Sequence, residues 1–104
     1  MTLEDVRGLS LFQTRAVSEA VKDEQTGLYV VECLNRFFTG DYGEVPQEDT
    51  DANNADLKAG SGRIVAHYKK AQQLRDDLCI ICEFNGDPDD LQSNYTTVLY
   101  RSEY

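Results

Sequence analysis

The sequence predicts a single α+β domain over residues 1–104, with two to three N-terminal helices packed on a C-terminal three-stranded antiparallel sheet. Apolar residues recur at helical spacing up to about residue 60, and from residue 63 apolar and polar residues alternate instead. A chain of 104 residues is long enough for one hydrophobic core. Three successive strands with short connections most simply form an antiparallel meander, so we expect the helices to cover one face of it.

Three segments carry helical signals. Thr14 can cap a short helix over 14–23, and the preceding residues 9–13 form either a brief edge strand or an extended lead-in. The strongest signal lies in 24–41, whose apolar stripe comprises Leu28, Val30, Val31, Leu34, Phe37 and Phe38. An acidic third helix is expected from about Pro46 to Lys58, because proline and acidic residues both suit a first helical turn.

Three later segments carry strand signals. Apolar and polar residues alternate in 63–69, which predicts a strand with two different faces. Residues 78–84 are a nearly continuous apolar run, as expected of a central strand or of one covered on both faces. Residues 95–104 close the chain with β-branched and aromatic side chains, which predicts the third strand.

The chain is strongly acidic. Ten basic residues against nineteen acidic ones give a formal net charge of −9. Direct binding to nucleic acid is therefore disfavoured, because affinity for phosphates comes mainly from clustered lysine and arginine. An acidic face can instead dock on a protein with a basic surface, including one whose groove normally holds DNA or RNA. The alternative is that the charge serves solubility alone.

The three cysteines, Cys33, Cys79 and Cys82, are too few and too odd in number for a secreted disulfide framework. The N-terminal segment lacks the basic and apolar regions of a signal peptide, and no stretch approaches the ~20 apolar residues of a membrane span. We expect a cytoplasmic protein that does not enter a membrane.

Two acidic clusters are the candidate partner-binding residues. The first acidic cluster consists of Asp41, Glu44, Glu48, Asp49, Asp51 and Asp56, and the second of Asp87, Asp89 and Asp90. Tyr42 joins the first because the turn "GDYG" is expected to present it at the surface. If the fold brings both clusters to one side, their charges could resemble a phosphate backbone. The alternative is that two solvated elements are acidic independently.

Cofactor and metal sites are not supported by the motifs. Asp49, Asp51 and Asn53 imitate the start of a calcium loop, but its sixth and twelfth positions hold Asn54 and Gly60 in place of glycine and glutamate. The C-x-x-C pair lies inside a strand pattern, where its two side chains point to opposite faces. We therefore expect no metal and no cofactor, and a structural role for the single histidine, His67.

Two alternatives to a docking surface remain open. In the first, Tyr42, Arg63, His67 and Tyr68 converge on a pocket at the junction of helices and sheet, which would indicate a small enzyme or ligand-binding domain. In the second, the chain forms a homodimer through its C-terminal strand.

A pattern of short motifs covers most of the chain. It comprises C-L, G-D-Y-G, an E-D pair with a later asparagine and aspartate, a glycine-rich stop, a strand ending in tyrosine, and T-T-V-L-Y before E-Y. The residues are Cys33, Leu34, Gly40, Asp41, Tyr42, Gly43, Glu48, Asp49, Asn54, Asp56, Gly60, Gly62, Tyr68, Thr96, Thr97, Val98, Leu99, Tyr100, Glu103 and Tyr104. This pattern resembles a family of short uncharacterised bacterial proteins found on plasmids, integrated elements and phages.

The resemblance implies a mobile-element setting and carries over no activity. Two segments depart from it, the acidic loop at 84–94 and the ending at 100–104, where the family has a proline before the last acid. Small proteins in that setting often block host defence nucleases by occupying their nucleic-acid surfaces. We therefore expect a non-enzymatic protein-binding module, extending to an inhibitor of the anti-CRISPR or anti-restriction type.

Overall fold

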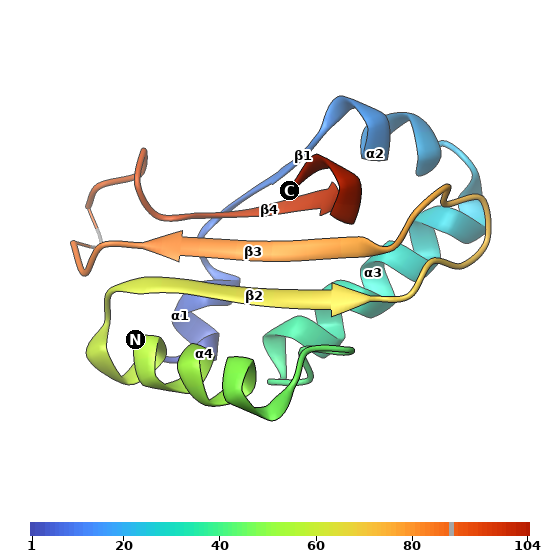
Figure 1. The fold of residues 1–104 in the computed structure, drawn as a ribbon. Helices are drawn as coiled ribbons and strands as arrows, with labels where there is room; N and C mark the ends of the chain where they lie inside the picture. Colours follow the sequence, from blue (N-terminus) through green and yellow to red (C-terminus); the bar gives the residue numbers. More distant parts are fainter. Residues whose placement is uncertain (88) are drawn as a thin grey trace.

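In residues 1–87 and 89–104, which the computed structural model describes, four strands form one mixed sheet and four α-helices surround it (Figure 1). The helices are α1 (Leu3–Arg7), α2 (Arg15–Ala20), α3 (Glu24–Phe38) and α4 (Gln47–Ala59). The strands are β1 (Ser10–Gln13), β2 (Gly62–Tyr68), β3 (Leu78–Phe84) and β4 (Tyr95–Tyr100). A short 3-10 helix, η1 (Arg101–Glu103), follows β4.

The strand order is β1-β4-β3-β2. β2, β3 and β4 form the expected antiparallel meander, but β1 pairs with β4 in parallel. The α+β class therefore holds, whereas the predicted three-stranded antiparallel sheet is wrong. Of the two alternatives for residues 9–13, the edge strand is the one observed. Its parallel pairing with β4 could not be predicted, because β1 has only four residues, all exposed, and its partner is far along the chain.

α1 was not expected from the apolar pattern, because a single residue of it, Val6, is buried. Its start does have a local signal. Thr2 accepts a hydrogen bond from the Asp5 N–H, and Asp5 in turn accepts one from the Thr2 N–H. This reciprocal capping box satisfies backbone donors that a first helical turn leaves free.

α3 is the central core helix, as predicted, but it is rotated relative to the predicted stripe. Its buried residues are Thr26, Val30, Cys33 and Phe37. Leu28 and Val31, which the pattern placed in the core, are 58% and 52% exposed. Two neighbouring rows of this helix are apolar, and contacts with the sheet decide which one is buried.

The two faces of the sheet have different surroundings. One face contributes Ile64, Tyr68, Ile80 and Val98 to the core, against which Val6, Val17 and Phe37 of the helices pack. We call the opposite side, which carries Val65, His67 and Cys79, the open face. α4 lies along the outer edge of β2, whereas α1 and α3 lie behind the sheet in Figure 1. The helices thus cover one face and one edge.

Cys79 and Cys82 confirm the predicted alternation. Cys79 pairs with His67 on the open face, and Cys82 pairs with Ile64 on the core face. All three cysteines, including Cys33 in α3, are buried free thiols. Burial raises the pKa of each one, so the thiols stay protonated at neutral pH.

Candidate functional site

α4 closes the outer edge of β2 with side chains. Asn53 Nδ2 donates to the Val65 carbonyl at 2.9 Å, and the Val65 N–H donates to Asn53 Oδ1 at 3.0 Å. One turn later, Asp56 Oδ2 accepts from the Arg63 N–H at 3.0 Å. The amide of Asn53 therefore replaces the peptide group of a neighbouring strand, and it is only 4% exposed.

The segment between α3 and α4 completes this closure. The Glu44 N–H donates to the His67 carbonyl at 2.7 Å, and the His67 N–H donates to the Tyr42 carbonyl at 3.0 Å. Gly43, between these residues, has a φ of +73°, and a Cβ there would meet the His67 carbonyl. Only glycine allows the two backbones to approach so closely. The outer N–H groups of Arg63, Val65 and His67 and the outer carbonyls of Val65 and His67 are thus bonded.

The first acidic cluster divides by structural role. Asp41 accepts from Arg36 Nε at 2.7 Å and from the Gly43 N–H, which lowers its pKa. Asp56 holds β2, as described above. The remaining four are exposed and form no salt bridge within the described residues. We call them the free acids of α4, because Glu48, Asp49 and Asp51 lie in its first half and Glu44 lies just before it.

Tyr42 is not at the surface, so its predicted presentation by the turn is wrong. It is 3% exposed, and its ring packs edge-on against Phe37 with 6.0 Å between centroids. Within the described residues its hydroxyl has no hydrogen-bond partner, and burial raises its pKa. The positive φ of Gly40 and Gly43 turns the chain so that Tyr42 points into the core.

The second acidic cluster lies in a loop organised by a buried amide. Asn94 Nδ2 donates to the carbonyls of Asp87 and Asp90, and Asn94 Oδ1 accepts from the Asn85 N–H. The Asp90 carboxylate accepts from Asn85 Nδ2 at 2.9 Å. Hydrogen bonds from Ser93 and Asn85 lower the pKa of Asp90. Asp87 and Asp90 therefore hold the loop together through hydrogen bonds, in addition to giving it negative charge.

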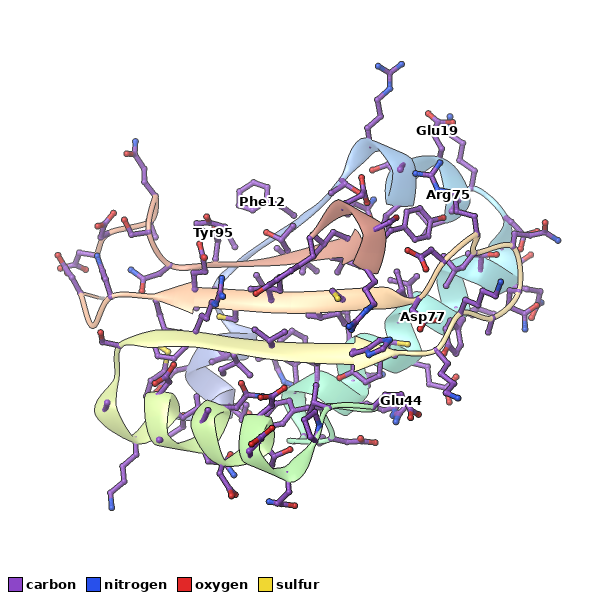
Figure 2. All side chains as sticks on the ribbon, viewed as in Figure 1. Phe12, Glu19, Glu44, Arg75, Asp77 and Tyr95 are labelled. Carbon is purple, nitrogen blue, oxygen red and sulfur yellow. The ribbon has the colours of Figure 1, made fainter. Side chains whose placement is uncertain are left out.

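The second acidic cluster lies at the end of the sheet where β2 begins, whereas the first extends along α4 from Glu44, at the opposite end, to Asp56, beside Arg63. The loop with the second cluster follows Phe84, which pairs with Gly62 at the start of β2. Glu44 is bonded to His67 at the end of β2, as its position in Figure 2 shows. A strand of this length spans about 20 Å. Glu44 and the second cluster are therefore separated by the length of β2, and Asp56, which lies at the end nearer the second cluster, is engaged with the backbone of β2.

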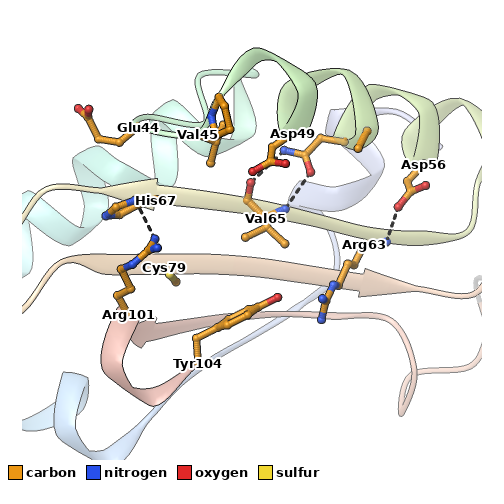
Figure 3. A pocket seen from close by; sticks show the side chains of 13 residues that line it. Glu44, Val45, Asp49, Asp56, Arg63, Val65, His67, Cys79, Arg101 and Tyr104 are labelled. Carbon is orange, nitrogen blue, oxygen red and sulfur yellow. Dashed lines mark hydrogen bonds between the residues drawn. The ribbon is translucent and has the colours of Figure 1, made fainter.

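A groove of about 590 Å³ lies on the open face, between β2 and the first half of α4 (Figure 3). Val65 and Cys79 form part of its floor, and Arg63, His67 and Arg101 line it with Tyr104. The Arg63 guanidinium lies over the Tyr104 ring, 5.6 Å from its centroid. Of the four residues predicted to share a pocket, Arg63 and His67 meet here. Tyr42 and Tyr68 lie in the core on the other side of the sheet.

His67 is held at both ring nitrogens. Nε2 lies 2.7 Å from Asp77 Oδ2, and Nδ1 lies 3.0 Å from Arg101 Nη1. Arginine can only donate, so Nδ1 accepts and Nε2–H donates to Asp77. The hydrogen bond from His67 lowers the pKa of Asp77. Neither nitrogen remains to take a proton from the adjacent thiol of Cys79, whose pKa is raised by burial.

Neither a metal cluster nor a membrane-spanning element is found in the described residues. No group of three or more histidine, cysteine, aspartate or glutamate side chains in 1–87 and 89–104 is arranged to hold a metal ion. The same residues contain no helix with the length and apolar character needed to span a membrane.

Sequence reasoning missed the residues that bind α4 to β2. Asn53 sits among acidic and polar neighbours, and only its i, i+4 spacing to buried Leu57 hints that it faces the sheet. No feature of the sequence indicated that Arg101 and Tyr104 line the groove. Comparison with known proteins adds no assignment: no family model matches the sequence, and no curated protein or solved structure was found to be similar. The resemblance to mobile-element proteins stays a prediction.

Proposed function

We propose that this chain is a non-enzymatic protein-binding module, which docks on a basic surface of another protein through the free acids of α4. One observation carries the proposal. Four exposed carboxylates, three on α4 and Glu44 just before it, form no ion pair within the described residues, and other side chains fix the helix to the sheet. The residues that anchor the helix and those that present charge are therefore different.

This separation matters for recognition. A charge that already has an ion-pair partner contributes little to docking, because that partner must be displaced. The free acids of α4 have no such cost, and a rigid helix limits the entropy lost when they are bound. Glu48 and Asp49 also suit the first turn of α4, whose N-cap, Pro46, makes no side-chain hydrogen bond. That local effect accounts for Glu48 and Asp49, and Asp51 accepts a hydrogen bond from Gln47 Nε2 at 2.9 Å within the same helix. None of these contacts neutralises the negative charge of a carboxylate.

The partner is a protein with a clustered basic surface. Proteins that handle nucleic acids carry such surfaces, because they bind phosphates through lysine and arginine. The resemblance to mobile-element proteins extends the proposal to a host defence enzyme that targets nucleic acid. At physiological salt the screening length is ~8 Å. Carboxylates in the first half of α4 lie close enough together to attract an approaching cation jointly.

The test is affinity capture from the host with mass spectrometry, followed by binding kinetics with the purified partner. The variant carries Glu48→Lys, Asp49→Lys and Asp51→Lys. A matched control carries Glu4→Lys, Glu24→Lys and Glu32→Lys, which change the net charge equally at exposed positions of α1 and α3. We expect the α4 variant to lose the partner and the control to keep it, with association slowing as salt rises.

Two results would overturn the proposal. Equal loss in both variants would mean that overall charge is recognised rather than α4. Full retention in the α4 variant would show that these acids do not contact the partner. Circular dichroism of each variant establishes that binding, and not folding, has changed.

A further inference from the structure

The two edges of the sheet differ in whether their outward backbone groups are hydrogen-bonded. The β2 edge is closed by Asn53, Asp56 and the segment 42–44. β1, at the other edge, pairs with β4 alone among the residues that the structure describes. The Thr14 N–H donates inward to the Val98 carbonyl, and directions alternate along a strand, so the backbone groups of Leu11 and Gln13 point outward. β1 therefore offers two N–H and two C=O groups to another strand.

The same edge exposes two large apolar side chains. Leu11 is 51% and Phe12 56% exposed. The Phe12 ring meets the edge of the Tyr95 ring, with 6.0 Å between centroids and 78° between planes. Figure 2 shows this pair at the margin of the sheet. An unpaired edge with exposed apolar residues is the usual template for the addition of a further strand.

The charge of the residues around β1 indicates which molecule supplies the added strand. Residues 6–18 and 91–102, which contain β1 and β4, carry no acidic side chain in a chain of net charge −9 and include Arg7, Arg15 and Arg101. The carboxylate of Glu103, which contacts Thr14 after β1, accepts hydrogen bonds from the Thr14 hydroxyl and the Tyr100 N–H. A second copy of this chain is repelled by most of the surface of the first, and this edge is where the two repel each other least. A basic partner, in contrast, gains nothing here.

We propose that β1 pairs with β1 of a second copy, antiparallel about a two-fold axis at Phe12. Phe12 then faces the partner's Phe12 as a non-hydrogen-bonded pair, in which side chains come closest. Leu11 faces the partner's Gln13, and Gln13 faces the partner's Leu11. Each pair exchanges two backbone hydrogen bonds, so all the outward groups of β1 are used. The two sheets become one continuous sheet.

This pairing replaces the homodimer expected through the C-terminal strand. β4 lies between β1 and β3, so it has no free edge. The β2 edge disfavours growth beyond two copies, because the Arg63 N–H and the outer groups of Val65 and His67 are already bonded. Four backbone hydrogen bonds and two phenylalanine rings make a small interface, which corresponds to a weak, concentration-dependent dimer.

In the dimer, the two α4 helices lie at the two outer ends of the joined sheet, each beside its own β2. The dimer therefore presents two copies of the free acids of α4 and leaves both accessible. The two interactions respond oppositely to salt. Screening strengthens the association of two acidic chains and weakens docking on a basic partner. Either proposal can therefore fail without the other.

Sedimentation equilibrium from about 10 µM to about 1 mM tests the pairing, a range suited to weak association. We expect the wild-type mass to rise toward that of two chains, and to rise further at higher salt. Phe12→Lys should remain monomeric, because it places like charges opposite each other across the axis. Gln13→Pro should also remain monomeric, because it removes an outward N–H that the single chain does not use. Leu91→Lys, at an exposed loop residue, should dimerise normally.

Amide exchange supplies a second readout. The amides of Leu11 and Gln13 should exchange more slowly at high protein concentration, whereas that of Phe12, which points toward β4, should not change. The proposal is overturned if the wild type stays monomeric throughout, or if a dimer survives both Phe12→Lys and Gln13→Pro. A dimer without protection at Leu11 and Gln13 would equally refute strand pairing.

Discussion

Replacing Asn53 by alanine should destabilise the domain far more than its place in a polar helix suggests. The substitution removes both hydrogen bonds to Val65 and leaves a backbone N–H and C=O at the sheet edge without partners. Each bond contributes ~1 kcal/mol, and unpaired groups that water reaches poorly add to the loss. Alanine is the better helix former by ~0.6 kcal/mol, which offsets part of it. We expect a net loss of about 2 kcal/mol, which lowers Tm by about 10 °C in a domain of this size.

Urea denaturation followed by circular dichroism measures this loss. Asn54→Ala is the matched control, because Asn54 is the exposed neighbour of the same residue type in the same helix. It should change stability by no more than the difference in helix propensity, and in the stabilising direction. The amide of Val65 should also exchange faster in the Asn53 variant alone. Equal stability of the two variants would refute the view that α4 is held to β2 by this side chain.

Two further predictions concern the same end of the sheet. Gly43→Ala should cost about 3 kcal/mol in thermal or urea unfolding, since its Cβ would meet the His67 carbonyl and its φ is positive. Gly60→Ala, at a similar φ but with a Cβ only in ordinary contact with the Met1 nitrogen at 3.8 Å, should cost about 1 kcal/mol, and equal losses would contradict the close approach. The pKa of Asp77 is lowered from 3.8 by His67, so its contribution to stability is present above pH 3.8 and is lost as pH falls through the folded value. In the Asp77→Asn variant, the free energy of unfolding should therefore fall less steeply as pH is lowered through the acid range. An unchanged slope would contradict the pairing of Asp77 with His67.

The elements that depend on local pattern could be predicted from the sequence. α4 and β3 were expected nearly at their observed bounds, because proline, acidic first-turn residues and a continuous apolar run act over a few neighbours. β1 could not be assigned to the sheet, because its pairing depends on a strand far along the chain. The buried row of α3 was also undetermined, since Leu28 and Val30 are equally apolar and only the sheet distinguishes them.

The candidate site shows the same division. Asp49 and Asp56 belong to one acidic helix and are indistinguishable by pattern, yet Asp56 binds the backbone of β2 and Asp49 has no ion-pair partner among the described residues. Their roles depend on how α4 is placed along β2, which is a tertiary property. Tyr42 was expected at the surface because turns are usually exposed, but two glycines reverse the chain and point it inward. Composition predicted the amount of negative charge and not its distribution.

The parallel pairing of β1 with β4 has a consequence for how the chain folds. Ser10 pairs with Tyr95, so β1 must remain without its neighbour until residues 95–98 have left the ribosome. Contacts between residues so distant in sequence slow folding, because closing a long loop precedes any gain from the contact. During synthesis the apolar segment around Phe12 is therefore exposed for longer than any other strand, and chaperone binding would be expected there first.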